Sequence, residues 1–188
     1  MQLDPGAASF SGTNDGSAKR AERIGPNAIG VYADAGGNGT SRTSTATLTW
    51  TVSAEDLAFH GPDATISVLV EPAVSLLLDS DAADGNAAGF DMSIRGQTGG
   101  DEVGTGASTP YSIGSDDRFV LENTSERLGF GASLVVDGDL TIVWTVTCRA
   151  HGADSFFLPF SISTCDALDD SHGVSLASAR ITVRAPDA

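Results

Sequence analysis

Lysine is almost absent from this sequence: Lys19 is the only one in 188 residues, beside nine arginines. Acidic residues outnumber basic ones 25 to 10, which gives a net charge of -15. Phosphate backbones select basic surfaces, so nucleic acid is excluded as a main partner. At molar salt the Debye length falls to about 3 Å and such self-repulsion disappears. We therefore expect a halophilic, acidic surface; a mesophilic acidic domain is the alternative.

Long apolar runs and aromatic residues are also scarce. Aromatics make up 6% of the chain and the mean hydropathy is zero. No apolar run reaches the length of a bilayer span, and the first residues do not form a signal peptide. These features exclude a membrane-spanning protein and a disordered tail, and the length suits one domain.

Cysteine is limited to Cys148 and Cys165. Neither belongs to a C-x-x-C motif, which argues against a zinc or redox site. Two buried thiols, one disulfide within the chain and a bond to a neighbouring chain all remain open.

Signatures of catalysis are missing as well. The chain has three histidines, no G-x-S-x-G elbow and no glycine-rich phosphate loop. We therefore expect a protein that is not an enzyme and has no organic cofactor. Two H-x-x-D units, His60 with Asp63 and His151 with Asp154, would hold a divalent metal only if the fold brought them together. Ordinary polar turns are the alternative.

The densest acidic loop offers a weak metal site. Asp79, Asp81 and Asp84 precede a glycine, as the ligands of a calcium loop do. Ala83 stands at a position that needs an oxygen ligand, and no closing Glu follows. Ca²⁺ or another hard cation is one interpretation, and a solvated turn is the other.

What the sequence does contain is a period of two. Residues 45–52 alternate threonine with apolar side chains, and Leu140, Ile142, Trp144, Val146 and Cys148 repeat the pattern. Each is typical of a strand with one buried face. Trp50 and Trp144 fall on the apolar side, so we expect both in the core. Residues 48–53 resemble residues 142–147, as two equivalent halves of a Greek-key fold would.

Further short strands separated by glycine-rich links complete an all-β pattern. We expect a single jelly roll or β-sandwich of about eight to ten antiparallel strands over residues 28–184. A helical turn should begin after Ser53. Residues 1–27 should form an extended N-terminal arm, and residues 185–188 a C-terminal tail.

The arm holds the only basic cluster, with Lys19, Arg20 and Arg23. We expect these residues to pair with carboxylates of another subunit, supported by burial of Phe10 and Ile24. The underside of a membrane is an alternative partner, and a solvated mobile terminus is the plainest one.

Taken together, a loose arm, a Gly- and Thr-rich β-barrel and a salt-adapted surface resemble the smaller major capsid proteins of haloarchaeal icosahedral viruses with an internal membrane. The resemblance is architectural and rests on no diagnostic motif. It implies a structural capsid protein of the virion, made in the host cytoplasm, that forms oligomers with itself and with a related capsid subunit.

Two alternatives come from other classes. Residues 6–10 resemble the start of the donor strand in matrix-fibre proteins related to TasA, which implies an extracellular or cell-surface fibre subunit. A non-catalytic binding module is the other. Asn38-Gly39-Thr40 and Asn123-Thr124-Ser125 are glycosylation sequons, and they matter only if the protein faces the outside.

Overall fold

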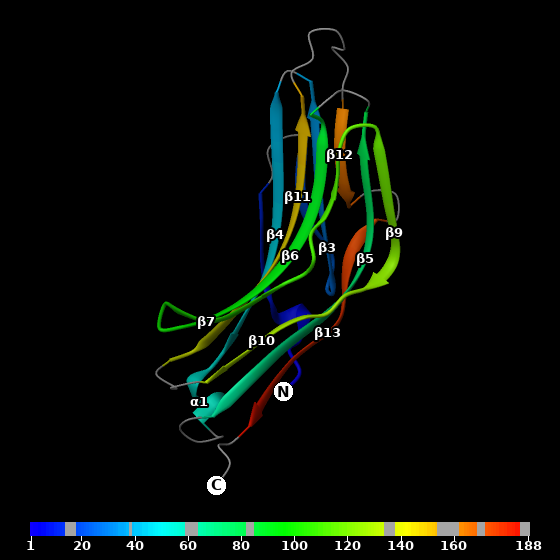
Figure 1. The fold of residues 1–188 in the computed structure, drawn as a ribbon. Coiled ribbons are helices and arrows are strands. Elements are labelled where there is room, and N and C mark those ends of the chain that lie inside the picture. Colours follow the sequence, from blue (N-terminus) through cyan, green and yellow to red (C-terminus); the bar gives the residue numbers. More distant parts are fainter. Residues whose placement is uncertain are drawn as a thin grey trace.

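The computed structural model describes residues 1–13, 18–37, 39–58, 64–81, 85–133, 138–153, 162–168 and 172–184. Two antiparallel sheets pack face to face, which confirms the expected all-β sandwich (Figure 1). The two helical elements in this part of the chain, η1 (Pro5–Ala7) and α1 (Ala54–Ala58), are short. Neither of them has the length or the apolar character that crossing a membrane requires.

The chain passes repeatedly between the two sheets, in the manner of a jelly roll. Sheet A contains β2 (Lys19–Gly25), β3 (Ala28–Gly36), β5 (Thr65–Ser80), β9 (Asp117–Ser125), β10 (Leu128–Ser133), β12 (Ile162–Ala167) and β13 (Gly173–Arg184). Sheet B contains β1 (Ser9–Gly12), β4 (Thr40–Val52), β6 (Ala87–Thr98), β7 (Asp101–Ala107), β8 (Tyr111–Ile113) and β11 (Leu140–Gly152). The strands outnumber the expected eight to ten because edge strands such as β1 and β8 are too short to show a period of two.

The centre of sheet B is formed by three long strands, with β11 between β4 and β6. Trp50 on β4 and Trp144 on β11 both point into the core, with 4% and 0% of their surfaces exposed. The similar segments noted in the sequence are direct neighbours: Trp144 lies opposite Leu48, and Trp50 opposite Ile142. The two tryptophans therefore occupy one layer of the core, on adjacent strands of the same sheet.

Sheet A is organised around β5, a strand of 16 residues that pairs with β9, β10, β12 and β13. Its register with β13 is interrupted by a bulge between Leu176 and Ser178, next to Pro72. A proline within a sheet is tolerated at such bulges because it cannot donate to the ladder. The predicted helical turn is α1, and the Ser53 hydroxyl accepts a hydrogen bond from the Asp56 amide at 3.1 Å.

A disulfide joins the two sheets. Cys148 on β11 and Cys165 on β12 are bonded, with their Cα atoms 5.5 Å apart, which settles the alternatives that the sequence left open. Closing a loop of this length stabilises a fold by about 3 kcal/mol. The sheets converge nearby, where a side chain at Gly152 would collide with the carbonyl oxygen of Gly36.

The N-terminal segment is built into the sandwich, in contrast to the extended arm that we expected. The Met1 amino group donates to the Ile181 carbonyl at 2.8 Å, β1 pairs with β4, and β2 pairs with β3. Leu3, Ala8 and Ala21 are buried. The physical reason is that the edges of β13, β4 and β3 present unpaired backbone groups, and this segment satisfies them. The expected tail, residues 185–188, lies outside the described residues.

Candidate functional site

The outer face of sheet B differs in composition from the rest of this acidic chain. Alternation and register along its three central strands define the outward positions. They are Ser41, Thr43, Thr45, Thr47, Thr49 and Thr51 on β4, Thr141, Val143, Thr145, Thr147, Arg149 and His151 on β11, and Ala87, Gly89, Asp91, Ser93, Arg95 and Gln97 on β6. We call this set the hydroxyl face. It has eight threonines and a single carboxylate, that of Asp91.

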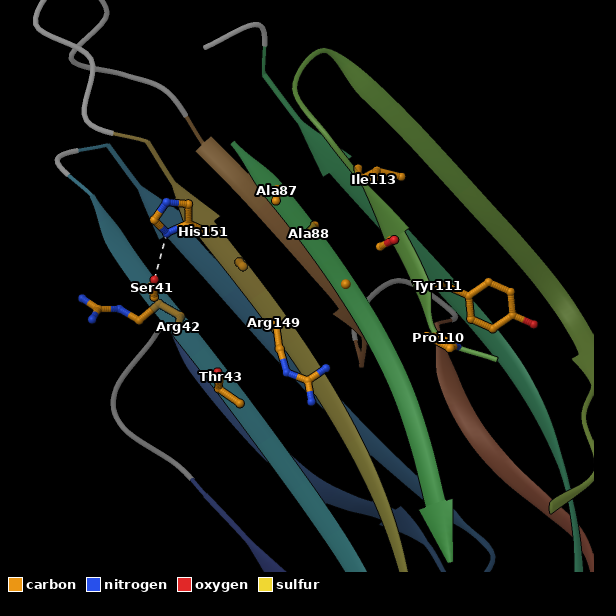
Figure 2. Close-up of a pocket in the computed structure, with 13 residues that line it drawn as sticks. Ser41, Arg42, Thr43, Ala87, Ala88, Pro110, Tyr111, Ile113, Arg149 and His151 are labelled. Atoms are coloured by element: carbon orange, nitrogen blue, oxygen red, sulfur yellow. Dashed lines mark hydrogen bonds between the residues drawn. The ribbon is translucent and has the colours of Figure 1, made fainter. Parts of the chain in front are cut away.

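One end of the hydroxyl face is hollowed. Ala87 and Gly89 lie opposite His151 and Arg149 in the register, and their small size leaves space above β6. The resulting hollow has a volume of about 380 Å³ (Figure 2). Its lining comes from β4 (Ser41, Arg42, Thr43), β6 (Ala87, Ala88, Gly89), β8 and the residue before it (Pro110, Tyr111, Ser112, Ile113) and β11 (Arg149, Ala150, His151).

Two pairs of polar side chains lie at the hollow. The Ser41 hydroxyl oxygen lies 2.8 Å from Nδ1 of His151, within hydrogen-bond distance. The Arg149 guanidinium donates to the Asp91 carboxylate, and 54% of the Arg149 side chain remains exposed. The ion pair cancels the charge of Arg149, and Arg42 brings a second guanidinium to the lining, so the hollow offers both donors and acceptors.

Tyr111 lines the hollow but does not present its ring to it. Its side chain points away from Arg149 and His151 (Figure 2), and the ring stacks on Phe119 at 5.4 Å between centroids. Its hydroxyl donates to Glu126. Burial, with help from the Glu126 carboxylate, raises the pKa of Tyr111 to about 12. The imidazole of His151 is the other aromatic ring in the lining, so this hollow has no Trp, Tyr or Phe ring on which a sugar could stack.

A serine hydrogen-bonded to a histidine, as Ser41 is to His151, is also found in sites of nucleophilic catalysis. An activated serine needs a base that is itself held by a third group, usually a carboxylate. Within the described residues, His151 has Ser41 as its hydrogen-bond partner and contacts no carboxylate. The companion residue of its H-x-x-D unit, Asp154, lies outside those residues, as do His60 and Asp63. The Ser41–His151 pair is therefore better suited to hydrogen bonding with a ligand than to nucleophilic attack by Ser41.

The described residues of the weak cation site lie at sheet A, not at the hydroxyl face. Asp79, on β5, pairs in register with Arg118 of β9. The Asp81 carboxylate accepts the Ile162 amide at 3.2 Å, and Asp84 lies outside the described residues. Among the residues that are described, no three His, Cys, Asp or Glu side chains gather as metal ligands would.

The residues expected to dock on a neighbour make contacts within their own domain. Arg23 donates to the carbonyls of Pro5 at 2.6 Å, Ala8 at 2.9 Å, Gly25 and Pro26, and so fastens the first residues to the β2–β3 hairpin. The Arg20 guanidinium lies 4.9 Å above the Tyr32 ring. Phe10 packs against the core, Lys19 is half-buried, and Ile24 alone is largely exposed, at 51%.

Sequence reasoning did not single out Arg149, Asp91 or Ser41. A usable signal was present: the odd positions of residues 41–51 and 141–151 contain no acid at all, in a chain with 25 acids. What the sequence could not show is that these two stretches lie side by side with β6, which supplies the small residues.

Comparisons with known proteins give no family. No family model matches the chain, and no curated protein is significantly similar. Among solved structures, TmCBM61, described in complex with beta-1,4-galactotriose, is 12% identical, with 90% of this chain and 88% of that chain covered and a TM-score of 0.34. The C-terminal family 22 carbohydrate-binding module of Clostridium thermocellum Xyn10B is 14% identical, with 93% and 92% covered and a TM-score of 0.27. A xylan-binding domain of the same family 22 is 13% identical, with 93% and 92% covered and a TM-score of 0.26.

These values are too low to say anything about what the present chain binds. None of the three structures is a viral capsid protein. The two packed antiparallel sheets of this chain support the resemblance to capsid jelly rolls at the level of an all-β sandwich and no further.

Proposed function

We propose that this protein is a non-catalytic binding domain that recognises a neutral saccharide chain on the hydroxyl face of sheet B. The observation that carries the proposal is the composition of that face: one carboxylate among its eighteen outward positions, in a chain of net charge -15. An unselected surface of this protein would carry several carboxylates. Rows of hydroxyl groups next to a hollow suit a ligand that is itself made of hydroxyl groups.

The net charge of the whole chain favours neutral sugars over acidic ones as ligands. Each sugar hydroxyl both donates and accepts, and the Arg149–Asp91 pair supplies partners of both kinds. An acidic polymer would be repelled by the remaining negative charge of the chain. Hydrogen bonds formed in exchange for water contribute only about 1 kcal/mol each, and no Trp, Tyr or Phe ring faces the ligand. Binding should therefore be weak, with a Kd on the order of 1 mM.

The disulfide supports a place outside the cell. Bonds such as that between Cys148 and Cys165 persist in oxidising surroundings and are rare in the cytosol. An extracellular or cell-surface protein would also meet polysaccharides. Mass spectrometry of the protein from its source, with thiols blocked before lysis, tests this placement: two free thiols would contradict it.

Affinity electrophoresis tests the binding itself. We expect neutral polymers such as xylan and galactan to retard the native protein, and an acidic polymer such as polygalacturonate to leave its mobility unchanged. Arg149→Ala and His151→Ala should abolish the retardation. Arg118→Ala, on sheet A, removes the same charge as Arg149→Ala and is the matched control. If no neutral polymer slows the protein, or if the Arg118 variant loses binding equally, the proposal fails.

A self-assembling surface subunit is the second candidate function, and β1 favours it. This edge strand, Ser9–Gly12, has no charged residue, and the described part of the chain provides no strand on its outer side. Uncharged edges readily pair with another chain. Sedimentation over a range of concentrations is the test, with Ser11→Lys to blunt the edge. Assembly that this variant abolishes would support the second candidate; a monomer at every concentration would exclude it.

A further inference from the structure

We infer that Asn123 is an acceptor site for an N-linked glycan, at the edge of sheet A and away from the hydroxyl face. Asn123-Thr124-Ser125 is a complete sequon, with no proline in the middle position. Three independent observations from the structure support glycosylation at this sequon.

The first observation is backbone conformation. Asn123 has φ +46°, in the left-handed region that few residues other than glycine adopt. It lies where the register of β9 with β5 shifts, between Val74 and Leu76, and its amide donates to the Ser75 hydroxyl at 3.1 Å. The acceptor asparagine therefore stands on a bulge, outside the regular ladder.

The second observation is that the groups that react and are recognised are accessible. Asn123 and Ser125 are both exposed. Their side chains make no hydrogen bond to any described residue, so the Asn123 amide and the Ser125 hydroxyl are available to an enzyme. Strand β9 lies at the edge of sheet A, where a transferase can approach without opening the fold.

The third observation is the Cys148–Cys165 disulfide, which is typical of the compartments in which N-glycosylation takes place. In the reaction, Nδ2 of Asn123 forms a bond to the anomeric carbon of an oligosaccharide carried on a lipid phosphate. The bond from that carbon to the phosphate oxygen breaks, the lipid phosphate leaves with the electron pair, and the amide loses one proton. Nothing is oxidised or reduced.

A glycan at this position would also protect an edge. Within the described residues β9 pairs on one side only, with β5, and Val120, three residues before the sequon, is 46% exposed. A bulky, hydrated group on such a strand blocks pairing with other chains. The other sequon has its asparagine, Asn38, outside the described residues and carries no inference.

Export of the full chain through a yeast secretory pathway tests the inference. Trypsin cuts after Arg118 and Arg127, which isolates the sequon in one peptide. We expect that peptide to carry a glycan, and a glycan-releasing amidase to leave aspartate at position 123. Ser125→Ala should remove the glycan without touching the acceptor, and Ser125→Thr should retain it.

Aggregation provides the second readout. The Ser125→Ala protein should aggregate severalfold more than the Ser125→Thr protein at equal concentration. An unmodified Asn123 in protein that is exported and folded, while a control glycoprotein in the same cells is modified, would overturn the inference. Because the site lies on sheet A, its failure would leave the proposed saccharide binding on sheet B untouched.

Discussion

Trp144 and Trp50 share one layer of the core but differ in their polar contacts. The Trp50 indole nitrogen donates to the Asp4 carbonyl at 3.0 Å, whereas the Trp144 indole nitrogen is buried without a partner among the described residues. Truncating either to alanine should cost about 3–5 kcal/mol. Trp50→Phe should cost about 1 kcal/mol more than Trp144→Phe, because only the former loses a hydrogen bond. Urea denaturation measures all four variants; equal costs for the two phenylalanine variants would refute this assignment.

Tyr111 makes the stability depend on alkaline pH. Its pKa is raised to about 12 in the folded chain by burial and by the Glu126 carboxylate, against about 10 when unfolded. Between these values the folded state holds the proton more tightly, so unfolding becomes easier as the pH rises from about 10 to about 12, and the effect is absent below that window. Thermal unfolding at several pH values, with Tyr111→Phe as control, checks this. A variant that loses stability over the window as steeply as the native protein would show that Tyr111 is not responsible.

At the scale of elements, the N-terminal segment is the most consequential part of the fold. Removing it would expose Trp50 and the edge of β4. Leu3, which belongs to this segment, is itself buried, with 5% of its surface exposed. Leu3→Ala should therefore cost about 2–5 kcal/mol, and deleting residues 1–12 should cost more. Gln2→Ala, at an exposed neighbour, is the matched control. The midpoint of thermal unfolding is the measurement; an unchanged midpoint after deletion would mean that the segment is only a tail.

The same segment shows how far the sequence could lead. Long alternations such as residues 45–52 and 140–148 predict their strands and both buried tryptophans, because the period of two is itself the signature of a half-buried strand. β1 and β2 lack that signature: β1 has four residues, and β2 places charged side chains on both faces. Edge pairing decides their structure, and edge pairing is a property of the assembled sheet.

The hollow could not be predicted from the sequence, for a related reason. Arg149 and His151 belong to a recognisable strand, but the space above them is created by Ala87 and Gly89, more than fifty residues away in the chain. Only the register of β6 against β11 brings large and small residues together. The positive charge of residues 19–23 led to the prediction of a contact with another subunit. In the structure the Arg23 guanidinium instead donates hydrogen bonds to carbonyls of its own chain.

For the whole molecule, charge predicts a response to salt. A net charge of -15 on 188 residues repels itself in dilute buffer, and salt screens that repulsion. The midpoint of thermal unfolding should rise between about 0.1 M and about 3 M NaCl. A variant with Asp101, Asp116 and Asp117 changed to Asn, all of them exposed, should show a smaller rise. A midpoint that stays constant or falls as salt is added would contradict the expected salt adaptation.

Binding to the hydroxyl face is tested most directly by mapping amide chemical shifts by NMR while a neutral xylan- or galactan-derived oligosaccharide is titrated into the protein. The largest shifts should fall on Ser41, Thr43, Gly89, Arg149 and His151, which border the hollow on three adjacent strands. Amides of sheet A, such as those of β9 and β12, should stay unchanged. Shifts that gather on sheet A, or a spectrum that does not respond to any neutral oligosaccharide, would contradict the assignment of this face as the binding site.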